Sequence, residues 1–209
     1  MKKSIWPLLF LIFLLAALAW VRISPFKLIE QDIIARWQGI QSTDSIRFFQ
    51  WISDTISFIS LGIPAVFVAI GITRKRKEFV RNGLIILLSI GLGGTISAVI
   101  KRTIKEPRPY EVDSRIAQWS KGGSNSFPSG HTTEVSAAAL GFSLILFRTP
   151  PAILLSILWA LLMMSSRIIL GVHNFTDILG GFVTACIGLW IVQEGFRRYD
   201  ARRQDNVVS

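Results

Sequence analysis

Long apolar segments are the feature that most constrains what this chain can fold into. They recur along the sequence, and each is close to the length that a helix needs to cross a bilayer. We expect six spans, at residues 5–21, 55–73, 83–100, 131–147, 152–170 and 178–193. Because the chain is 51% hydrophobic and only 17% charged, an ordinary soluble domain is excluded. The sequence predicts an all-α integral membrane protein, with residues 1–209 forming one six-helix bundle.

The first apolar segment has two interpretations. Ala17-Leu18-Ala19 resembles the cleavage site of a secretory signal peptide. The segment is long for a signal peptide, however, and Trp20 and Arg22 at its end form an interfacial anchor pattern. We therefore favour a retained first helix.

Residues 24–54 are more polar and have helical periodicity. Their apolar side chains include Leu28, Ile29, Ile33, Ile34, Trp37 and Ile40. This pattern predicts one or two amphipathic helices lying in the membrane surface, between the first and second spans. The alternative is a helix that packs over the end of the transmembrane bundle.

The net charge of +10 admits nucleic acid as a partner, but the placement of the charges argues against it. Many basic residues lie in short connections between apolar segments, where the positive-inside rule places them in the cytoplasm. They include Lys2, Lys3, residues 74–81, Arg148 and the C-terminal arginines. We expect a multi-pass protein of the bacterial inner membrane with both termini cytoplasmic. The single cysteine, Cys186, excludes an intrachain disulfide.

Three short polar blocks interrupt the apolar pattern, and the expected topology places all three at the non-cytoplasmic face. They are residues 101–109, residues 128–131 and residues 166–177. The two histidines of the chain, His131 and His173, lie in the second and third blocks. Polar clusters at membrane depth are costly, which makes these blocks the candidate functional site.

The third block pairs His173 with Asp177. If a helix begins near His173, the two residues are four apart and share one helical face. A carboxylate that accepts a proton from one ring nitrogen leaves the other nitrogen as a base or nucleophile. The alternative is a polar pair that only caps the start of a helix.

The other blocks supply groups that bind anions. Ser129 and Gly130 precede His131 at an expected helix start, where backbone amides and the helix dipole favour negative charge. Lys101 and Arg108 add cations, as does Arg167 in the third block, and arginine in particular matches the geometry of phosphate oxygens. Lys101 could instead reach from a helix end to the headgroup layer.

Together these groups suit phosphoryl transfer. One histidine attacks phosphorus, the other protonates the leaving oxygen, and the cations and amides hold the remaining oxygens. This division of labour requires one neutral and one protonated histidine, so we expect a bell-shaped dependence of activity on pH.

The spacing of the blocks resembles the three-part signature of the type 2 phosphatidic acid phosphatases. That signature reads here as Lys101-x6-Arg108-Pro109, Pro128-Ser129-Gly130-His131 and Ser166-Arg167-x5-His173-x3-Asp177. Every signature position is present, in order. The six-span layout extends the resemblance to nearly the whole chain.

The resemblance implies a metal-independent lipid phosphatase that forms a phosphohistidine intermediate. His173 is the implied nucleophile, Asp177 its orienting partner and His131 the general acid. The implied phosphate ligands are Lys101, Arg108, Ser129, Gly130 and Arg167. The implied partners are a lipid phosphate and the bilayer, with no metal or other cofactor, and the implied site faces the periplasm or the cell exterior.

Other function classes are less consistent with the sequence. Two histidines and one cysteine offer few metal ligands, and a serine hydrolase lacks the Gly-x-Ser-x-Gly turn. A non-enzymatic anion-binding or transport protein is the alternative, although no repeat relates the two halves. The lipid stays open among phosphatidic acid, phosphatidylglycerophosphate, undecaprenyl pyrophosphate and a lipid A phosphate.

Overall fold

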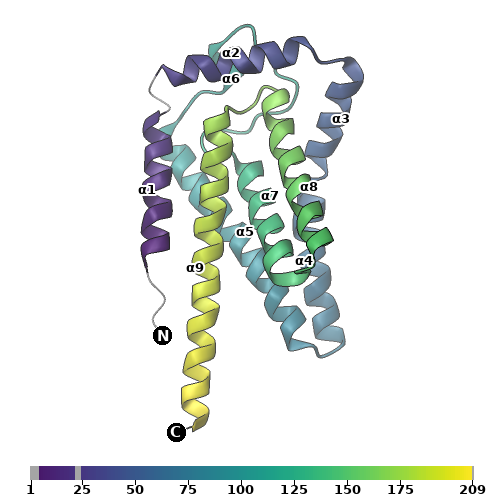
Figure 1. The fold of residues 1–209 in the computed structure, drawn as a ribbon, viewed down its shortest axis with the longest axis vertical. Helices are drawn as coiled ribbons and strands as arrows, with labels where there is room; N and C mark the ends of the chain where they lie inside the picture. Colours follow the sequence, from purple (N-terminus) through teal and green to yellow (C-terminus); the bar gives the residue numbers. More distant parts are fainter. Residues whose placement is uncertain (1–4, 22–24, 209) are drawn as a thin grey trace.

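The computed structural model describes residues 5–21 and 25–208, which form helices joined by short connections and one longer loop (Figure 1). In chain order the elements are α1 (Trp6–Val21), α2 (Phe26–Gly39), α3 (Thr43–Asp54), α4 (Ile56–Thr73), α5 (Lys77–Ile104), α6 (Pro109–Val112), α7 (Gly130–Gly141), the π-helix η1 (Phe142–Leu146), α8 (Pro150–Ile169) and α9 (Phe175–Val208). The longer loop connects α6 to α7. Lys2, Lys3 and Arg22 lie outside the described residues.

Helix α7 lies at the centre of the bundle, and its buried residues join two apolar clusters. Ala137 and Ala138 pack with residues of α5, η1 and α9, whereas Val135 and Ala139 pack with α3, α4 and α8. Small side chains permit this close packing between helices. The first turn of α7, which carries the second polar block, therefore lies between the helices that carry the other two.

Close contact between α5 and α9 depends on glycine. A Cβ atom at Gly188 would lie 3.0 Å from the backbone nitrogen of Gly93 and from the carbonyl oxygen of Ser89. A larger residue at position 188 would therefore separate the two helices.

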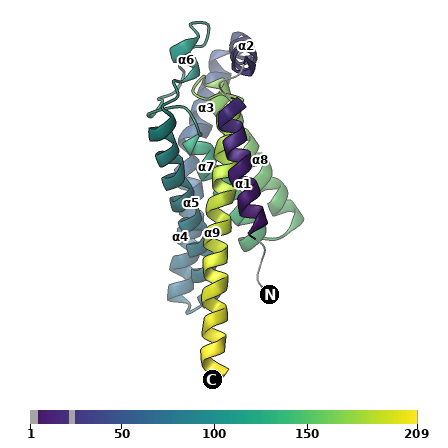
Figure 2. The ribbon, with the colours of Figure 1, turned by 90° about the vertical axis from the view of Figure 1, so that its left-hand side faces the viewer.

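Helix α2 lies across one end of the bundle, above the ends of α8 and α9 (Figures 1 and 2). Its buried residues, Glu30, Gln31, Ile34 and Gln38, recur at helical spacing on the side facing the bundle. This arrangement agrees with the alternative of a helix packed over the bundle. The second amphipathic helix, α3, is separated from α4 only by Thr55, so α3 and α4 together form one candidate span over Thr43–Thr73.

Among the described residues, four helical stretches are long and apolar enough to cross a membrane. They are Thr43–Thr73, Lys77–Val112, Pro150–Ile169 and Phe175–Gln204. The bent pair of α1 and α2 makes a fifth if it is taken as one span. The expected fourth span, residues 131–147, corresponds to α7 followed by η1, which fall outside this set. The structure thus confirms an all-helical membrane protein but not the count of six spans.

Two helices extend well beyond the spans expected from hydropathy. Helix α5 begins at Lys77 rather than near residue 83, and α9 continues to Val208 rather than ending near residue 193. The extension of α9 is polar and carries ion pairs within the helix, from Glu194 to Arg197 at 2.7 Å and to Arg198 at 2.8 Å. Such pairs stabilise a helix that no longer buries an apolar face.

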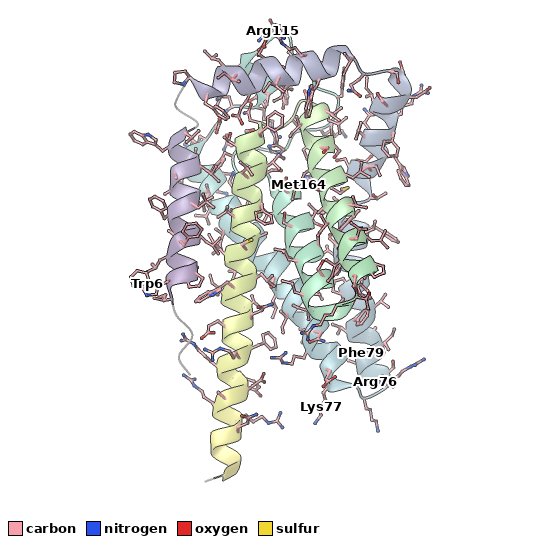
Figure 3. The ribbon with its side chains drawn as sticks, viewed as in Figure 1. Trp6, Arg76, Lys77, Phe79, Arg115 and Met164 are labelled. Atoms are coloured by element: carbon pink, nitrogen blue, oxygen red, sulfur yellow. The ribbon has the colours of Figure 1, made fainter. Side chains whose placement is uncertain are left out.

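Charged side chains lie at both ends of the bundle. Arg76 and Lys77, in the connection from α4 to α5, lie at the end opposite α2 and Arg115 (Figure 3). All three polar blocks lie at the α2 end. The polar blocks therefore lie at the end of the bundle away from Arg76 and Lys77 (Figure 3).

Candidate active site

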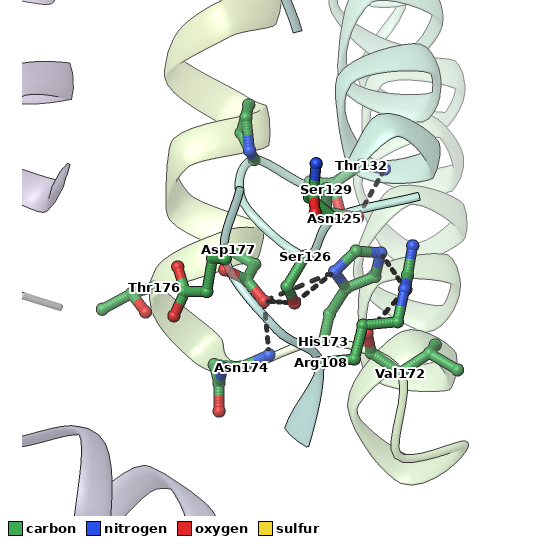
Figure 4. A network of polar contacts seen from close by, with 12 residues as sticks. Arg108, Asn125, Ser126, Ser129, Thr132, Val172, His173, Asn174, Thr176 and Asp177 are labelled. Carbon is green, nitrogen blue, oxygen red and sulfur yellow. Dashed lines mark hydrogen bonds and ion pairs between the residues drawn. The ribbon is translucent and has the colours of Figure 1, made fainter. Parts of the chain in front are cut away.

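His173 and Asp177 are the centre of the polar network at the α2 end (Figure 4). His173 lies in the connection between α8 and α9, and Asp177 lies in the first turn of α9. The Nδ1 atom of His173 is 3.4 Å from the Oδ2 atom of Asp177. Both side chains are buried. The carboxylate thus faces one ring nitrogen and leaves Nε2 directed away from it, although α9 begins at Phe175 and the two residues do not share a helical face as the spacing predicted.

Ser126, in the loop before α7, completes this pair and was not predicted from the sequence. Its hydroxyl donates a hydrogen bond to Oδ2 of Asp177 and lies 3.4 Å from Nδ1 of His173. The same carboxylate oxygen accepts the backbone N–H of Asn174 at 2.8 Å. Two donors besides the imidazole therefore fix the position of Oδ2.

Arg108 approaches the opposite side of the imidazole. Its Nη1 atom is 3.4 Å from Nε2 of His173 and donates to the carbonyl of Val172 at 2.8 Å. Its Nε atom donates to the carbonyl of Ser124 at 2.9 Å. An arginine is always a donor, so Nε2 facing it is the unprotonated nitrogen and Nδ1 carries the proton.

Lys101 lies at the end of α5 and holds the loop before α7. Its ammonium group donates to the carbonyls of Asn125 at 2.6 Å and Ser126 at 2.9 Å. An ammonium group has three donors, so one is left for a ligand. Lys101 therefore positions Ser126 as well as supplying charge.

The first turn of α7 presents the second block. The Ser129 Oγ atom accepts hydrogen bonds from the backbone N–H and the hydroxyl of Thr132, at 3.3 and 2.9 Å, which leaves its own hydroxyl proton to donate. The backbone N–H of Ser129 donates to the carbonyl of Asp177 at 2.9 Å, which ties α7 to α9. The N–H groups of Gly130 and His131 have no acceptor within the described part of the chain. They are the amides that a helix start offers to an anion.

His131 and Arg167 line a cavity of ≈ 790 Å³ beside this network. The cavity lies between α3 and the loop before α7, and its other lining residues are Gln50, Ser53, Asp54, Gln118, Trp119, Ser120 and Lys121. Arg167 is 2% exposed and its Nη1 atom donates to the hydroxyl of Ser53. Its buried Nε atom has no hydrogen-bond partner among the described residues. Such an unpaired donor favours an anionic oxygen in the cavity.

The site has more positive than negative charge. Lys101, Arg108 and Arg167 bind carbonyl or hydroxyl oxygens, and none of them forms a salt bridge with a carboxylate in the described part of the chain. Their charges act on the ring of His131. Buried cations are normally paired, so the buried Arg108 and Arg167 and the half-buried Lys101, without carboxylate partners, indicate a site for an anion.

Burial lowers the pKa of the His173 imidazole to about 4, and its hydrogen bond with Asp177 opposes that effect only in part. His173 is therefore neutral at pH 7, which is the state that a nucleophile requires.

The structure places all eight predicted site residues at one end of the bundle. Direct contacts join Arg108, His173 and Asp177, while His131 and Arg167 meet at the cavity. No direct contact between the two imidazoles is found in the described part of the chain. Sequence reasoning missed Ser53 and Ser126. Ser53 precedes Asp54 near the end of a polar helix, and Ser126 follows Asn125 in a Gly/Ser-rich loop, so neither belongs to a recognisable pattern.

Comparison with known proteins finds that the chain is similar to membrane phosphatases. Residues 82–199 match the family model of the PAP2 superfamily. Phosphatidylglycerophosphatase B of Bacillus subtilis is 30% identical over 139 residues, which cover 63% of this chain and 64% of that protein, less than two thirds of its length. A decaprenylphosphoryl-5-phosphoribose phosphatase of Mycobacterium tuberculosis is 30% identical over 149 residues, which cover 68% of this chain and 75% of that protein.

Solved structures share the fold. A transmembrane PAP2-type phosphatidylglycerolphosphate phosphatase of Bacillus subtilis aligns with a TM-score of 0.76 and 23% identity, over 91% of this chain and 96% of the other. LpxE of Aquifex aeolicus aligns with a TM-score of 0.65 and 21% identity, over 78% and 93%. At this level of identity the likeness concerns the architecture.

Proposed function

Because this chain belongs to the PAP2 superfamily, we propose that it is a membrane lipid phosphatase that hydrolyses a phosphomonoester or pyrophosphate of a lipid. One observation carries the proposal. The imidazole of His173 lies between Asp177 on its Nδ1 side and Arg108 on its Nε2 side, each at 3.4 Å. This is the arrangement of a neutral nucleophile oriented by a carboxylate and directed at an anion held by arginine.

In the proposed first step, Nε2 of His173 attacks phosphorus while the bond from phosphorus to the lipid oxygen breaks. His131 gives its proton to that oxygen, and a phosphohistidine remains on the enzyme. Asp177 stabilises the positive charge that develops on the ring. In the second step His131 takes a proton from water, the water oxygen attacks phosphorus, and the bond to Nε2 breaks to release phosphate.

His131 must be protonated in the first step, although burial, and after it the charges of Arg167, Arg108 and Lys101, disfavour the protonated ring. A bound phosphate dianion would offset those charges, so substrate binding itself favours the protonated form. The proposed phosphate ligands are Lys101, Arg108 and Arg167 through their side chains, Ser129 through its hydroxyl and Gly130 through its backbone amide. All are preorganised by contacts within the protein, which is the main requirement for stabilising phosphoryl transfer.

The proposed site faces the periplasm, with both termini in the cytoplasm of a cell whose inner membrane holds the protein. The position of Arg76 and Lys77 at the end opposite the site supports this orientation (Figure 3). Proposed substrates are phosphatidic acid, phosphatidylglycerophosphate, undecaprenyl pyrophosphate and a lipid A phosphate. The named relatives act, by their names, on a phosphatidylglycerophosphate and on a decaprenyl-linked sugar phosphate.

The test is phosphate release from these lipids by the purified full chain in detergent, with a metal chelator present. We expect turnover of at least one lipid by the wild type and none by His173→Ala. Turnover that chelator abolishes would contradict the metal-independent mechanism. Binding of lipid phosphates without any turnover would identify an anion-binding or transport protein instead.

Rapid quenching of a reaction with ³²P-labelled substrate into alkaline detergent, which preserves the acid-labile bond between phosphorus and histidine, tests the intermediate. We expect His131→Ala to form and break down the labelled enzyme more slowly, with greater losses for alkyl than for aryl phosphates because alkyl oxygens need the proton more. Equal losses for both would argue against its role as the acid.

A further inference from the structure

Helix α2 binds the catalytic end of the bundle through a buried carboxylate. Glu30 is 1% exposed and lies on the side of α2 that faces the bundle. Burial of a carboxylate is costly unless hydrogen bonds satisfy its oxygens. Both oxygens of Glu30 are satisfied by one residue of α9, Thr176, which is 146 positions away in the chain.

The contact with Thr176 caps helix α9. The backbone N–H of Thr176 donates to Oε1 of Glu30 at 2.7 Å, and its hydroxyl donates to Oε2 at 3.0 Å. Thr176 is the second residue of α9, so its amide has no acceptor within the helix. A carboxylate there also interacts favourably with the helix dipole.

The local sequence does not provide this cap. Asn174 occupies the position before α9, since its carbonyl accepts the N–H of Ile178 at 3.3 Å. An asparagine at that position usually caps the helix with its own side chain. Here both polar side-chain atoms of Asn174 are buried without a partner in the described part of the chain. Glu30 therefore replaces the missing local cap.

The capped turn also holds the proposed catalytic pair. Asp177 directly follows Thr176, and its carboxylate lies 3.4 Å from Nδ1 of His173 (Figure 4). A shift in the first turn of α9 moves this carboxylate relative to the ring. We propose that Glu30 is a positioning residue for the reaction, which acts by capping α9 so that Asp177 stays against His173. This inference rests on the function proposed above.

Glu30 can be changed without releasing α2, because the helix has other attachments on either side. Nζ of Lys27 lies 2.9 Å from Oε1 of Glu106. The side-chain amide of Gln38 donates to the carbonyls of Ala117 and Ile169 at 2.9 and 3.0 Å, and its Oε1 accepts the N–H of Ala117 at 2.8 Å. A substitution at Glu30 therefore removes the cap and keeps the helix in place.

The experiment compares Glu30→Ala, Glu30→Gln and the control Asp32→Asn in the full-length chain, with phosphatidylglycerophosphate and undecaprenyl pyrophosphate as probes. Because a misplacement of about 1 Å can cost about 100-fold in rate, we expect Glu30→Ala to lower kcat by about 10-fold or more with KM unchanged. Glu30→Gln keeps an acceptor for the Thr176 amide and should recover much of the loss. Asp32→Asn changes an exposed carboxylate that pairs with Arg36 and Arg115, and should stay within about twofold of wild type.

A spectroscopic measurement separates positioning from general damage. The chain has two histidines, so long-range ¹H–¹⁵N spectra resolve the tautomer of each ring. We expect His173 to carry its proton on Nδ1 in the wild type and Glu30→Gln, and to populate both tautomers in Glu30→Ala.

Three results would overturn the inference: a kcat for Glu30→Ala within about twofold of wild type, a rise in KM alone, or equal losses in all three variants. Activity of His173→Ala would instead refute the proposed mechanism itself, whatever Glu30 does. Loss of activity in His173→Ala together with a silent Glu30→Ala would refute the positioning role alone.

Discussion

Gly122 offers a way to displace Arg108 without touching its charge. A Cβ atom at position 122 would lie 2.8 Å from both Cδ and Nε of Arg108 and 2.6 Å from the hydroxyl oxygen of Tyr110. Ordinary contacts begin near 3.4 Å, so Gly122→Ala requires the Arg108 side chain to withdraw by about 0.6 Å. Gly122 does not have a positive φ, so backbone strain does not confuse the result.

The side chain of Arg108 cannot withdraw without loss, because it is held by carbonyls on two segments. Its Nη1 atom donates to Val172 at 2.8 Å, and a shift of about 0.6 Å would stretch that bond past the usual limit of about 3.2 Å. A misplacement of about 1 Å costs about 100-fold in rate, so we expect Gly122→Ala to lower kcat/KM by roughly 10-fold.

The control is Gly123→Ala, whose Cβ atom would lie 3.8 Å from Nη2 of Arg108, an ordinary contact. Both variants are assayed for phosphate release from the best lipid of the panel, and their thermal unfolding is followed to confirm that they fold. Equal activity of the two variants would refute the placement of Arg108 against the reacting phosphate.

Three further predictions concern the proposed nucleophile and its surroundings. The pKa of His173 is lowered to about 4 in the folded chain, against 6.5 as its ordinary value, so only the unfolded chain gains this proton between those values. We therefore expect stability to fall as pH drops from 6.5 toward 4, as followed by thermal unfolding in detergent, and His173→Gln to reduce that dependence. Asp177→Asn should keep the fold but lower kcat by on the order of 1,000-fold, because an amide no longer selects the Nδ1-protonated form of His173. A loss below about 10-fold in steady-state assays would contradict the role of Asp177 in orienting His173. Gly171 has a φ of +75°, and a Cβ atom there would lie 2.3 Å from the carbonyl oxygen of Ala117. Gly171→Ala should therefore lower the free energy of unfolding by at least about 2 kcal/mol. The control Gly39→Ala, whose Cβ atom would have no neighbour within 4 Å, should leave the stability unchanged.

Much of the site could be predicted because its chemistry is local in the sequence. His173 and Asp177 are four residues apart, and Ser129, Gly130 and His131 are consecutive, so the members of each group are expected close together, although His173 precedes α9 rather than lying on it. Hydropathy then brings the blocks to the same end of the bundle. The structure agrees with both steps.

The contributions of Glu30 and Ser126 could not be predicted in the same way, because they depend on which surfaces meet. Glu30 lies in an amphipathic segment that the sequence predicts in the membrane surface. Gln31 and Gln38 were not identified from the sequence as polar residues that are buried against the bundle. Their spacing with Ile34 is the signal that could have indicated it. Ser126 reaches Asp177 only through the path of its loop.

Hydropathy also failed at the ends of helices, because it detects membrane contact rather than helical structure. The polar end of α9 is stabilised by Glu194 with Arg197 and Arg198, which a hydropathy scan treats as the end of a span. The π-helix η1 divides the expected fourth span by a change of hydrogen bonding that leaves hydropathy unaltered.

The carbonyl-bound cations also affect which anions the site binds between reaction cycles. Lys101, Arg108 and Arg167 form no salt bridge in the described part of the chain, so the site attracts small oxyanions as well as a lipid phosphate. Inorganic phosphate, the product of the proposed reaction, carries the same oxygens as the substrate and should compete with it. The enzyme would then slow down where phosphate accumulates at the site and work fastest where phosphate is scarce.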